Sequence, residues 1–175
     1  MKASLKFLPI VVLSFFVNVA TSQNLETSIK VQAMEMQRAL LKQDFNAFYG
    51  FIHPKIVESI GGKERLKVNV DSASSAMKQF GVEIKKIIIG NPGPVINYKG
   101  QLQSVVPQTT TLQTAMGELV VETSLIATSD DKGKRWYFTD ANLYHAQLKA
   151  ALPDLSPALV IPQQKQPTFT PKKAD

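Results

Sequence analysis

Residues 63–89 read KERLKVNVDSASSAMKQFGVEIKKIII, and the spacing of their apolar side chains changes at Gly81. Before this glycine, apolar residues recur every three or four positions, as on one face of a helix. We therefore predict a helix from about Lys63 to Phe80, ended by Gly81. Its core-facing stripe would be Leu66, Val70, Ala73, Met77 and Phe80. After Gly81, the isoleucine-rich run Val82–Ile89 predicts a strand.

Two further helices are predicted upstream. The segment 25–52 carries a helical apolar stripe, which comprises Leu41, Phe45, Phe48 and Ile52. This helix should end near His53, because the residue before a proline is pushed out of helical geometry. Pro54 suits the first position of a short helix that reaches Ile60, and Gly61–Gly62 suits its end.

The second half of the chain predicts an antiparallel sheet of about five strands. The expected strands cover residues 82–89, 95–98, 101–114, 119–128 and 135–140. Pro107 predicts a sheet edge or a bulge, because proline cannot donate to the ladder. Alternation in 119–128 places Glu122 and Ser124 on a wet face, and a weak helix is expected over 142–152. Three N-terminal helices followed by these strands make an α+β fold, which we expect to be a strongly bent sheet roofed by helices, with a cone-like cavity.

The first 22 residues predict a cleaved secretory signal peptide. Lys2 and Lys6 precede an apolar run over 7–20, and Ala20-Thr21-Ser22 supplies small residues for cleavage before Gln23. We therefore expect an exported protein, periplasmic or secreted. Without cysteine, the chain has no thiol for a lipid anchor or a disulfide, so its stability must come from a hydrophobic core.

Length and charge narrow the function classes. Residues 23–162 suit a single domain, and the proline- and lysine-rich segment 163–175 is expected to be disordered. The formal net charge of +6 is scattered along the chain, whereas a nucleic-acid binder concentrates basic residues on one face. No later stretch is apolar enough for a membrane span. Two distant histidines and no cysteine make a metal site unexpected.

Several segments resemble exported bacterial proteins of the NTF2-like superfamily, cone-shaped α+β domains, among members without an assigned function. The similar segments are LKQDF at 41–45 with Phe48, His53-Pro54, Val57 and Gly61-Gly62; VVPQT at 105–109; and SDDKGKRWYF at 129–138. The resemblance covers most of residues 25–162, although the short hairpin that many members carry among their helices is not found. It implies the fold and leaves the activity open, because the superfamily includes isomerases, dehydratases, oligomerisation domains and binding proteins.

Two residues are candidates for acid–base chemistry. His53 lies near the expected cone wall and is a potential general base, although a histidine at a helix junction also serves as a cap. Asp140 ends the last strand on the face of Trp136 and Phe138, where it can accept a substrate proton. Asp140 is also well placed as the N-cap of the following helix.

The aromatic residues near these two suggest a pocket. Trp136 and Phe138 form either core or the floor of a ligand cavity, and Tyr49 and Tyr98 would add hydroxyl groups. The candidate pocket residues are Phe45, Tyr49, His53, Tyr98, Trp136, Phe138 and Asp140.

Three functions remain open. The first is an exported, non-catalytic domain that holds a small apolar or amphipathic ligand, or a partner's segment, in the cone. The second is a cone-pocket enzyme of the isomerase or dehydratase type, in which His53 and Asp140 transfer a proton and Tyr49 or Tyr98 stabilises developing charge. The third is a dimerisation or assembly module that uses the outer sheet face. No cofactor is expected, because the chain has neither a phosphate-cradling glycine loop nor a nucleophile motif.

Overall fold

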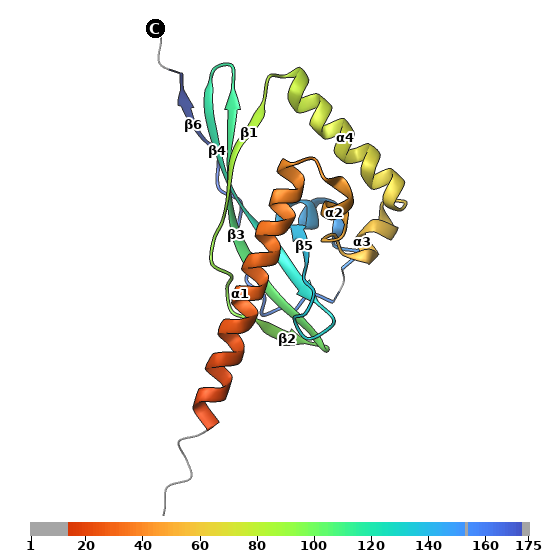
Figure 1. Ribbon diagram of the computed structural model, residues 1–175, viewed down its shortest axis with the longest axis vertical. Coiled ribbons are helices and arrows are strands. Elements are labelled where there is room, and N and C mark those ends of the chain that lie inside the picture. The colour runs from red at the N-terminus through yellow and green to blue at the C-terminus, as the bar shows by residue number, and fades with distance from the viewer. Residues whose placement is uncertain (1–13, 153, 173–175) are drawn as a thin grey trace, which may run out of the picture.

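The structure is a computed structural model that describes residues 14–152 and 154–172. It confirms an α+β arrangement around an antiparallel sheet, here of six strands. The helices are α1 (Ser14–Leu41), α2 (Phe45–Tyr49), α3 (Pro54–Ser59), α4 (Lys63–Gln79), α5 (Ala141–Leu143) and the π-helix η1 (Tyr144–Leu148). The strands are β1 (Glu83–Ile89), β2 (Ile96–Tyr98), β3 (Gln101–Thr114), β4 (Gly117–Ser129), β5 (Tyr137–Asp140) and β6 (Thr168–Pro171). In Figure 1, α1 crosses the sheet, and α2, α3 and α4 follow beside it.

The prediction of one helix over 25–52 is wrong, because the helix is interrupted after Leu41. Gln43 adopts a left-handed conformation with φ 57°. Asp44 then caps α2, and its side chain accepts a hydrogen bond from the backbone N–H of Ala47 at 3.1 Å. Aspartate is a favoured N-cap because its carboxylate satisfies an otherwise unpaired N–H group. The chain therefore turns before Phe45 rather than continuing along α1.

The local signals around α3 and α4 are confirmed. Pro54 is the first residue of α3, and Gly61 and Gly62 have φ values of 94° and 92°, which glycine adopts readily. The expected core-facing stripe of α4 is only partly correct. Leu66 is buried, whereas Phe80 is 74% exposed. Phe80 is the C-cap, just beyond the last residue of α4. Figure 1 shows α4 standing away from the strands.

The sheet has the order β1-β3-β4-β5, while β2 also pairs with β3 and β6 with β4. Pro107 lies within β3 opposite Ser124 of β4, in an unbroken register, so the expected bulge at this residue is absent, whereas its other side has no strand partner. Pairing of β3 with β1 ends at Gln108, and pairing with β2 begins at Gln103. Proline is tolerated because it lies between these two partners, where the ladder is interrupted. The register irregularity lies instead in β1, between Ile84 and Lys86.

Both faces of the C-terminal half of β4 are buried. Leu125 and Ala127 join a core cluster with Trp136, Phe138 and residues of α1. Ile126 points to the other face, where it packs in a second cluster with Ala141, Tyr144, Leu152 and Leu159. The segment after β5 therefore covers this face. It also explains why Ser124, expected on a wet face, is buried beside the start of α5.

The C-terminal part of the chain differs from the expectations in two places. Thr168–Pro171 pairs with Gly117–Val120 as β6, within the segment that was expected to be disordered. The weak helix expected over 142–152 is a short α5 followed by η1. Of the expected signal peptide, residues 1–13 lie outside the described part, and α1 begins at Ser14. No helix within the described residues is long and apolar enough to cross a membrane.

Candidate functional site

A cavity of about 570 Å³ lies between α4 and the sheet and is the main candidate site. Residues of α1, α2, α3, β1, β3, β4, β5, α5 and η1 complete its wall. Most of its lining is apolar: Met36, Leu40, Phe48, Ile52, Ile56, Ile60, Leu66, Val70, Ala73, Ile84, Ile87, Leu125, Phe138 and Leu143. Its size falls within the range of small-molecule sites, roughly 300–1,000 Å³. The cavity exists because α4 presents its apolar face from a distance.

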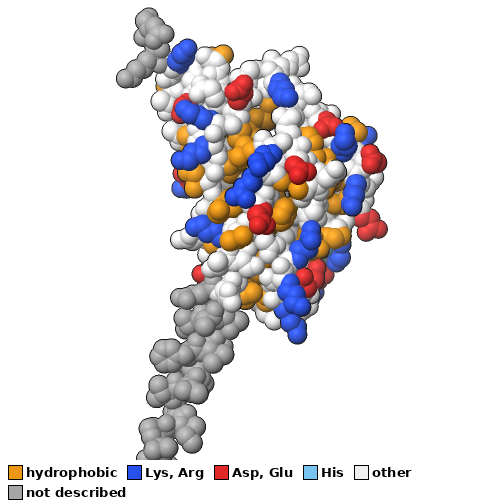
Figure 2. All heavy atoms as spheres, viewed as in Figure 1, with side chains coloured by type: hydrophobic (Ala, Val, Ile, Leu, Met, Phe, Trp, Pro, Cys, Tyr) orange, Lys and Arg blue, Asp and Glu red, His pale blue; other side chains and the backbone are white. Residues whose placement is uncertain are grey.

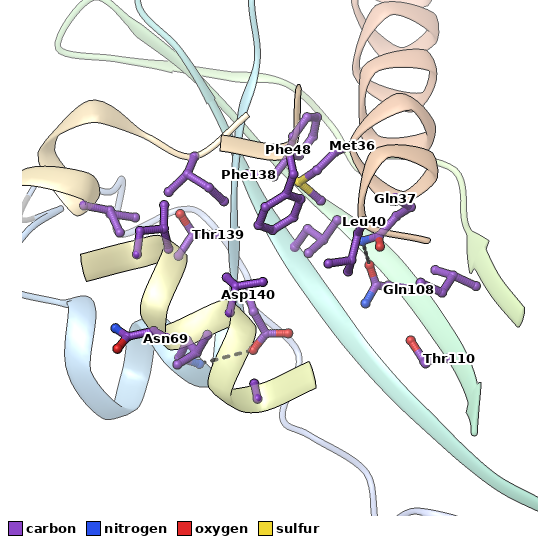
Figure 3. A pocket seen from close by; sticks show the side chains of 18 of the residues that line it. Met36, Gln37, Leu40, Phe48, Asn69, Gln108, Thr110, Phe138, Thr139 and Asp140 are labelled. Atoms are coloured by element: carbon purple, nitrogen blue, oxygen red, sulfur yellow. Dashed lines mark hydrogen bonds between the residues drawn. The ribbon is translucent and has the colours of Figure 1, made fainter. Parts of the chain in front are cut away.

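The polar side chains of this main cavity come from several elements. They are Gln37, Asn69, Gln108, Thr110, Thr139, Asp140 and Gln147. Gln37 donates a hydrogen bond from Nε2 to Oε1 of Gln108, so the two amides join α1 to β3 at the cavity wall (Figure 3). Asn69, Thr139 and Asp140 belong to another part of the lining in the same view. Among the described residues of this lining, Asp140 is the only formally charged side chain.

Asp140 is positioned by its role as a cap. Its Oδ1 accepts hydrogen bonds from the backbone N–H groups of Asn142 at 2.9 Å and Leu143 at 3.1 Å. These two contacts fix the carboxylate at the end of β5, and they confirm the alternative reading of Asp140 as an N-cap. In the described contacts, Oδ2 accepts no hydrogen bond. One carboxylate oxygen is therefore structural, and the other is available to the cavity.

A second cavity of about 540 Å³ lies under the C-terminal half of α4. It shares four apolar lining residues with the main cavity: Leu40, Val70, Ala73 and Ile84. Phe45 and Met77 line this second cavity only. The two spaces thus adjoin beneath α4. Unlike the main cavity, the second also has a basic and an acidic side chain in its lining, Lys78 and Glu83.

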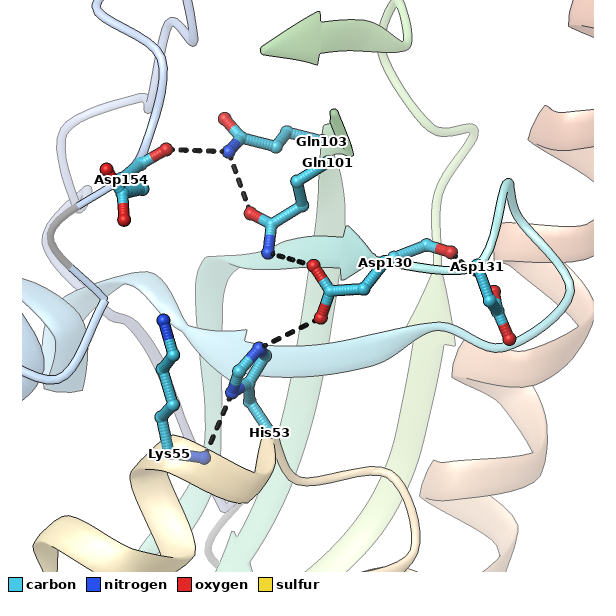
Figure 4. Close-up of polar contacts among 8 residues, drawn as sticks. His53, Lys55, Gln101, Gln103, Asp130, Asp131 and Asp154 are labelled. Atoms are coloured by element: carbon cyan, nitrogen blue, oxygen red, sulfur yellow. Dashed lines mark hydrogen bonds and ion pairs between the residues drawn. The ribbon is translucent and has the colours of Figure 1, made fainter. Parts of the chain in front are cut away.

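His53 lies outside the lining of both cavities. It caps α3, and its Nδ1 accepts a hydrogen bond from the backbone N–H of Lys55 at 3.1 Å. Its Nε2 faces Oδ2 of Asp130 at 3.6 Å (Figure 4). Burial lowers the pKa of the imidazole, and the nearby Asp130 carboxylate partly opposes this effect. With Nδ1 accepting, the neutral ring carries its proton on Nε2 and has no free lone pair for a substrate.

Asp130 belongs to a polar network that fastens the chain after β5. Gln101 donates to Oδ1 of Asp130, and Gln103 donates to Oε1 of Gln101 and to the backbone carbonyl of Asp154. Oε1 of Gln103 accepts from the backbone N–H of Ser156 at 2.8 Å. Gln103 is completely buried. Figure 4 shows the network as a chain of contacts from His53 to Asp154, and its role is structural.

The structure separates the residues that the sequence suggested for a pocket. Phe138 and Asp140 line the main cavity, and Phe45 lines the second. Trp136 is fully buried in the core. The remaining two tyrosines line neither cavity. The pair His53 and Asp140, expected to work together, is not brought together in one cavity.

Those two tyrosines have other surroundings. Tyr49 is buried, its hydroxyl has no hydrogen-bond partner within the described structure, and burial raises its pKa. Tyr98 lies on β2, with the ammonium group of Lys99 5.5 Å from its ring centre.

Sequence reasoning missed Gln37, Asn69 and Gln147 as cavity residues. Each is an ordinary polar residue within a helix, and only the packing of the helices on the sheet brings the three to one space.

No group of histidine, aspartate and glutamate side chains suited to a metal ion occurs among the described residues. Figure 2 shows basic and acidic side chains interspersed on the visible face, without a basic patch. Comparisons with family models, curated proteins and solved structures found no match to this chain.

Proposed function

We propose that this protein is an exported, non-catalytic binding domain of the NTF2-like kind, with a cone-like interior that holds a small apolar or amphipathic ligand. The observation that carries the proposal is the main cavity between α4 and the sheet, with its mostly apolar lining and few polar groups. Small-molecule sites combine these same features. The adjoining second cavity supports a ligand with an extended apolar part.

The physical drive for binding would be removal of apolar surface from water. Each buried methylene contributes about 0.8 kcal/mol, so an alkyl chain of moderate length can offset the entropy lost on association. The rigid β-sheet side of the cavity is well supported, because Phe138 and Leu125 are themselves buried core residues. The α4 side is less tightly packed and can adjust to the ligand.

The enzyme alternative has weaker support. Nδ1 of His53 is occupied by the backbone N–H of Lys55, and Nε2 lies 3.6 Å from Oδ2 of Asp130 rather than facing the cavity lining. A general base must reach the proton that it removes, and His53 does not line the cavity. The assembly alternative requires a free outer sheet face, and the segment after β5 covers that face at Ile126, which leaves Ile88 of β1 exposed on it.

Titration with the neutral dye N-phenyl-1-naphthylamine tests the proposal, because its fluorescence rises in apolar surroundings. We expect saturable binding of about one dye per chain. Ala73→Trp adds an indole to the wall shared by both cavities and should weaken binding by roughly tenfold or more, since the new ring occupies the ligand's space.

Ser75→Trp is the matched control. Ser75 is exposed and lines neither cavity, and a separation of two positions places it on nearly the opposite side of α4. Both variants carry the same added ring on the same helix. Absence of dye binding, or equal loss in both variants, would contradict the proposal.

A further inference from the structure

We propose that the ligand of the main cavity is an amphiphile with a cationic, ammonium-type head, and that Asp140 binds this head. The inference rests on the proposed function and adds the chemical class of the ligand. It follows from the distribution of charge in the main cavity, where Asp140 is the only charged side chain among the described lining residues. A bound cation would neutralise it, whereas an anion bound there would meet a carboxylate and, among these residues, no basic side chain.

The geometry of Asp140 suits a receptor for a head group. The two backbone N–H contacts at Oδ1 hold the carboxylate in place, so binding requires little further ordering of this side chain. Oδ2 has no hydrogen-bond donor among the described contacts and remains an acceptor. A charge-assisted hydrogen bond from an N⁺–H group to this oxygen is stronger than a neutral one.

Other polar residues of the main cavity can accept the remaining hydrogen bonds of an ammonium head. An ammonium group has three donors on a primary amine, and Asn69, Thr139 and Gln147 contribute amide and hydroxyl oxygens to the same lining. The rest of the main cavity's lining is apolar apart from Gln37, Gln108 and Thr110. An alkyl chain therefore finds mostly apolar surroundings in the main cavity.

The preference for a cationic over an anionic head arises because Asp140 lies in a mostly apolar cavity. The attraction between opposite charges at 4 Å is several times larger near a protein surface than in water, and a buried charge without a partner is costly. A carboxylate head would be repelled by Asp140 and would be buried without a basic partner among the described residues of the main cavity. The chain as a whole has a formal net charge of +6, which favours anions in non-specific binding. Preference for a cation would therefore be a property of the cavity.

A matched pair of ligands measures this preference. Decylammonium and decanoate have alkyl chains of similar length and opposite charge at pH 7. Each would compete with N-phenyl-1-naphthylamine for the native protein. We expect decylammonium to compete at a concentration at least about tenfold lower than decanoate.

Asp140→Asn removes the charge and keeps a residue that caps helices equally well. In this variant the two ligands should compete at concentrations within about threefold of each other. Asp44→Asn is the control, because Asp44 is also an N-cap but lines neither cavity. It should retain the native preference. Thermal unfolding of both variants would verify that the caps and the fold persist.

The outcomes separate the two proposals. Failure of the dye to bind native protein contradicts the proposed function. Dye binding with equal or stronger competition by decanoate overturns the cationic head alone. A preference for decylammonium that persists in Asp140→Asn assigns recognition elsewhere and also overturns the inference.

Discussion

Acidification below pH 6.5 should destabilise the fold through His53. The imidazole is 4% exposed, and its Nδ1 accepts the backbone N–H of Lys55 at the start of α3. Protonation at Nδ1 would place two N–H donors face to face and remove the cap. Burial, the main cause, lowers the pKa of His53 from its ordinary value of 6.5, although Asp130 opposes the shift.

The sign and the size of the effect follow from proton linkage. Between the lowered pKa of the folded state and 6.5, the unfolded chain binds more protons at this histidine than the folded chain does. The stabilisation is therefore complete above pH 6.5 and is lost as the pH falls through that value toward the folded-state pKa. One proton gives a slope of at most about 1.4 kcal/mol per pH unit. From pH 7.5 to 5.5, His53 can thus remove at most about 1.4 kcal/mol from the free energy of unfolding.

Urea denaturation at several pH values measures this loss. His53→Asn keeps a capping oxygen near the position of Nδ1 and removes the titration, so its unfolding free energy should fall less over this range than that of the native protein. His145→Asn is the matched control, because it makes the same substitution at an exposed histidine that caps no helix through its side chain. Identical curves for native protein and His53→Asn would refute the reasoning.

Three substitutions test other parts of the fold. Gly117→Ala should release β6 and expose the tail to proteases, because the added Cβ would lie 2.2 Å from the backbone oxygen of Thr170; unchanged proteolysis would contradict the pairing. Gln103→Met should cost about 1–3 kcal/mol, since it leaves the buried N–H of Ser156 without an acceptor, and denaturant unfolding measures this cost. Ile126→Ala should cost about 2–5 kcal/mol as a cavity in the buried core, and a loss below 1 kcal/mol in the same assay would show that this face is not packed as described.

Local chemistry made much of the fold predictable. Pro54 and the glycine pair at 61–62 encode backbone geometry directly, so the bounds of α3 and the start of α4 agree with the predictions. β3 was predicted over 101–114 and has those bounds, because turn residues flank a β-prone run. In contrast, the break at Gln43 could not be predicted, because glutamine is also a good helix former. The pairing of β6 depends on a distant partner strand.

The site was harder to predict than the fold. Alternation along the last strand pointed to Phe138 as a pocket candidate, and the end of that strand pointed to Asp140; both side chains line the main cavity. The apolar period of α4 identified which side of the helix is apolar, but it carries no information on how near the sheet lies. The cavity results from that distance. Asn69 and Gln147 lie far apart in sequence and meet only through tertiary packing.

A crystal structure of the protein grown with decylammonium tests the central claim most directly. We predict α4 separated from the sheet, with the alkyl chain between Phe138 and Val70 and the ammonium group within hydrogen-bond distance of Asp140. A helix α4 packed down on the strands, with Val70 and Ala73 filling the interior and no room for a ligand, would contradict the account.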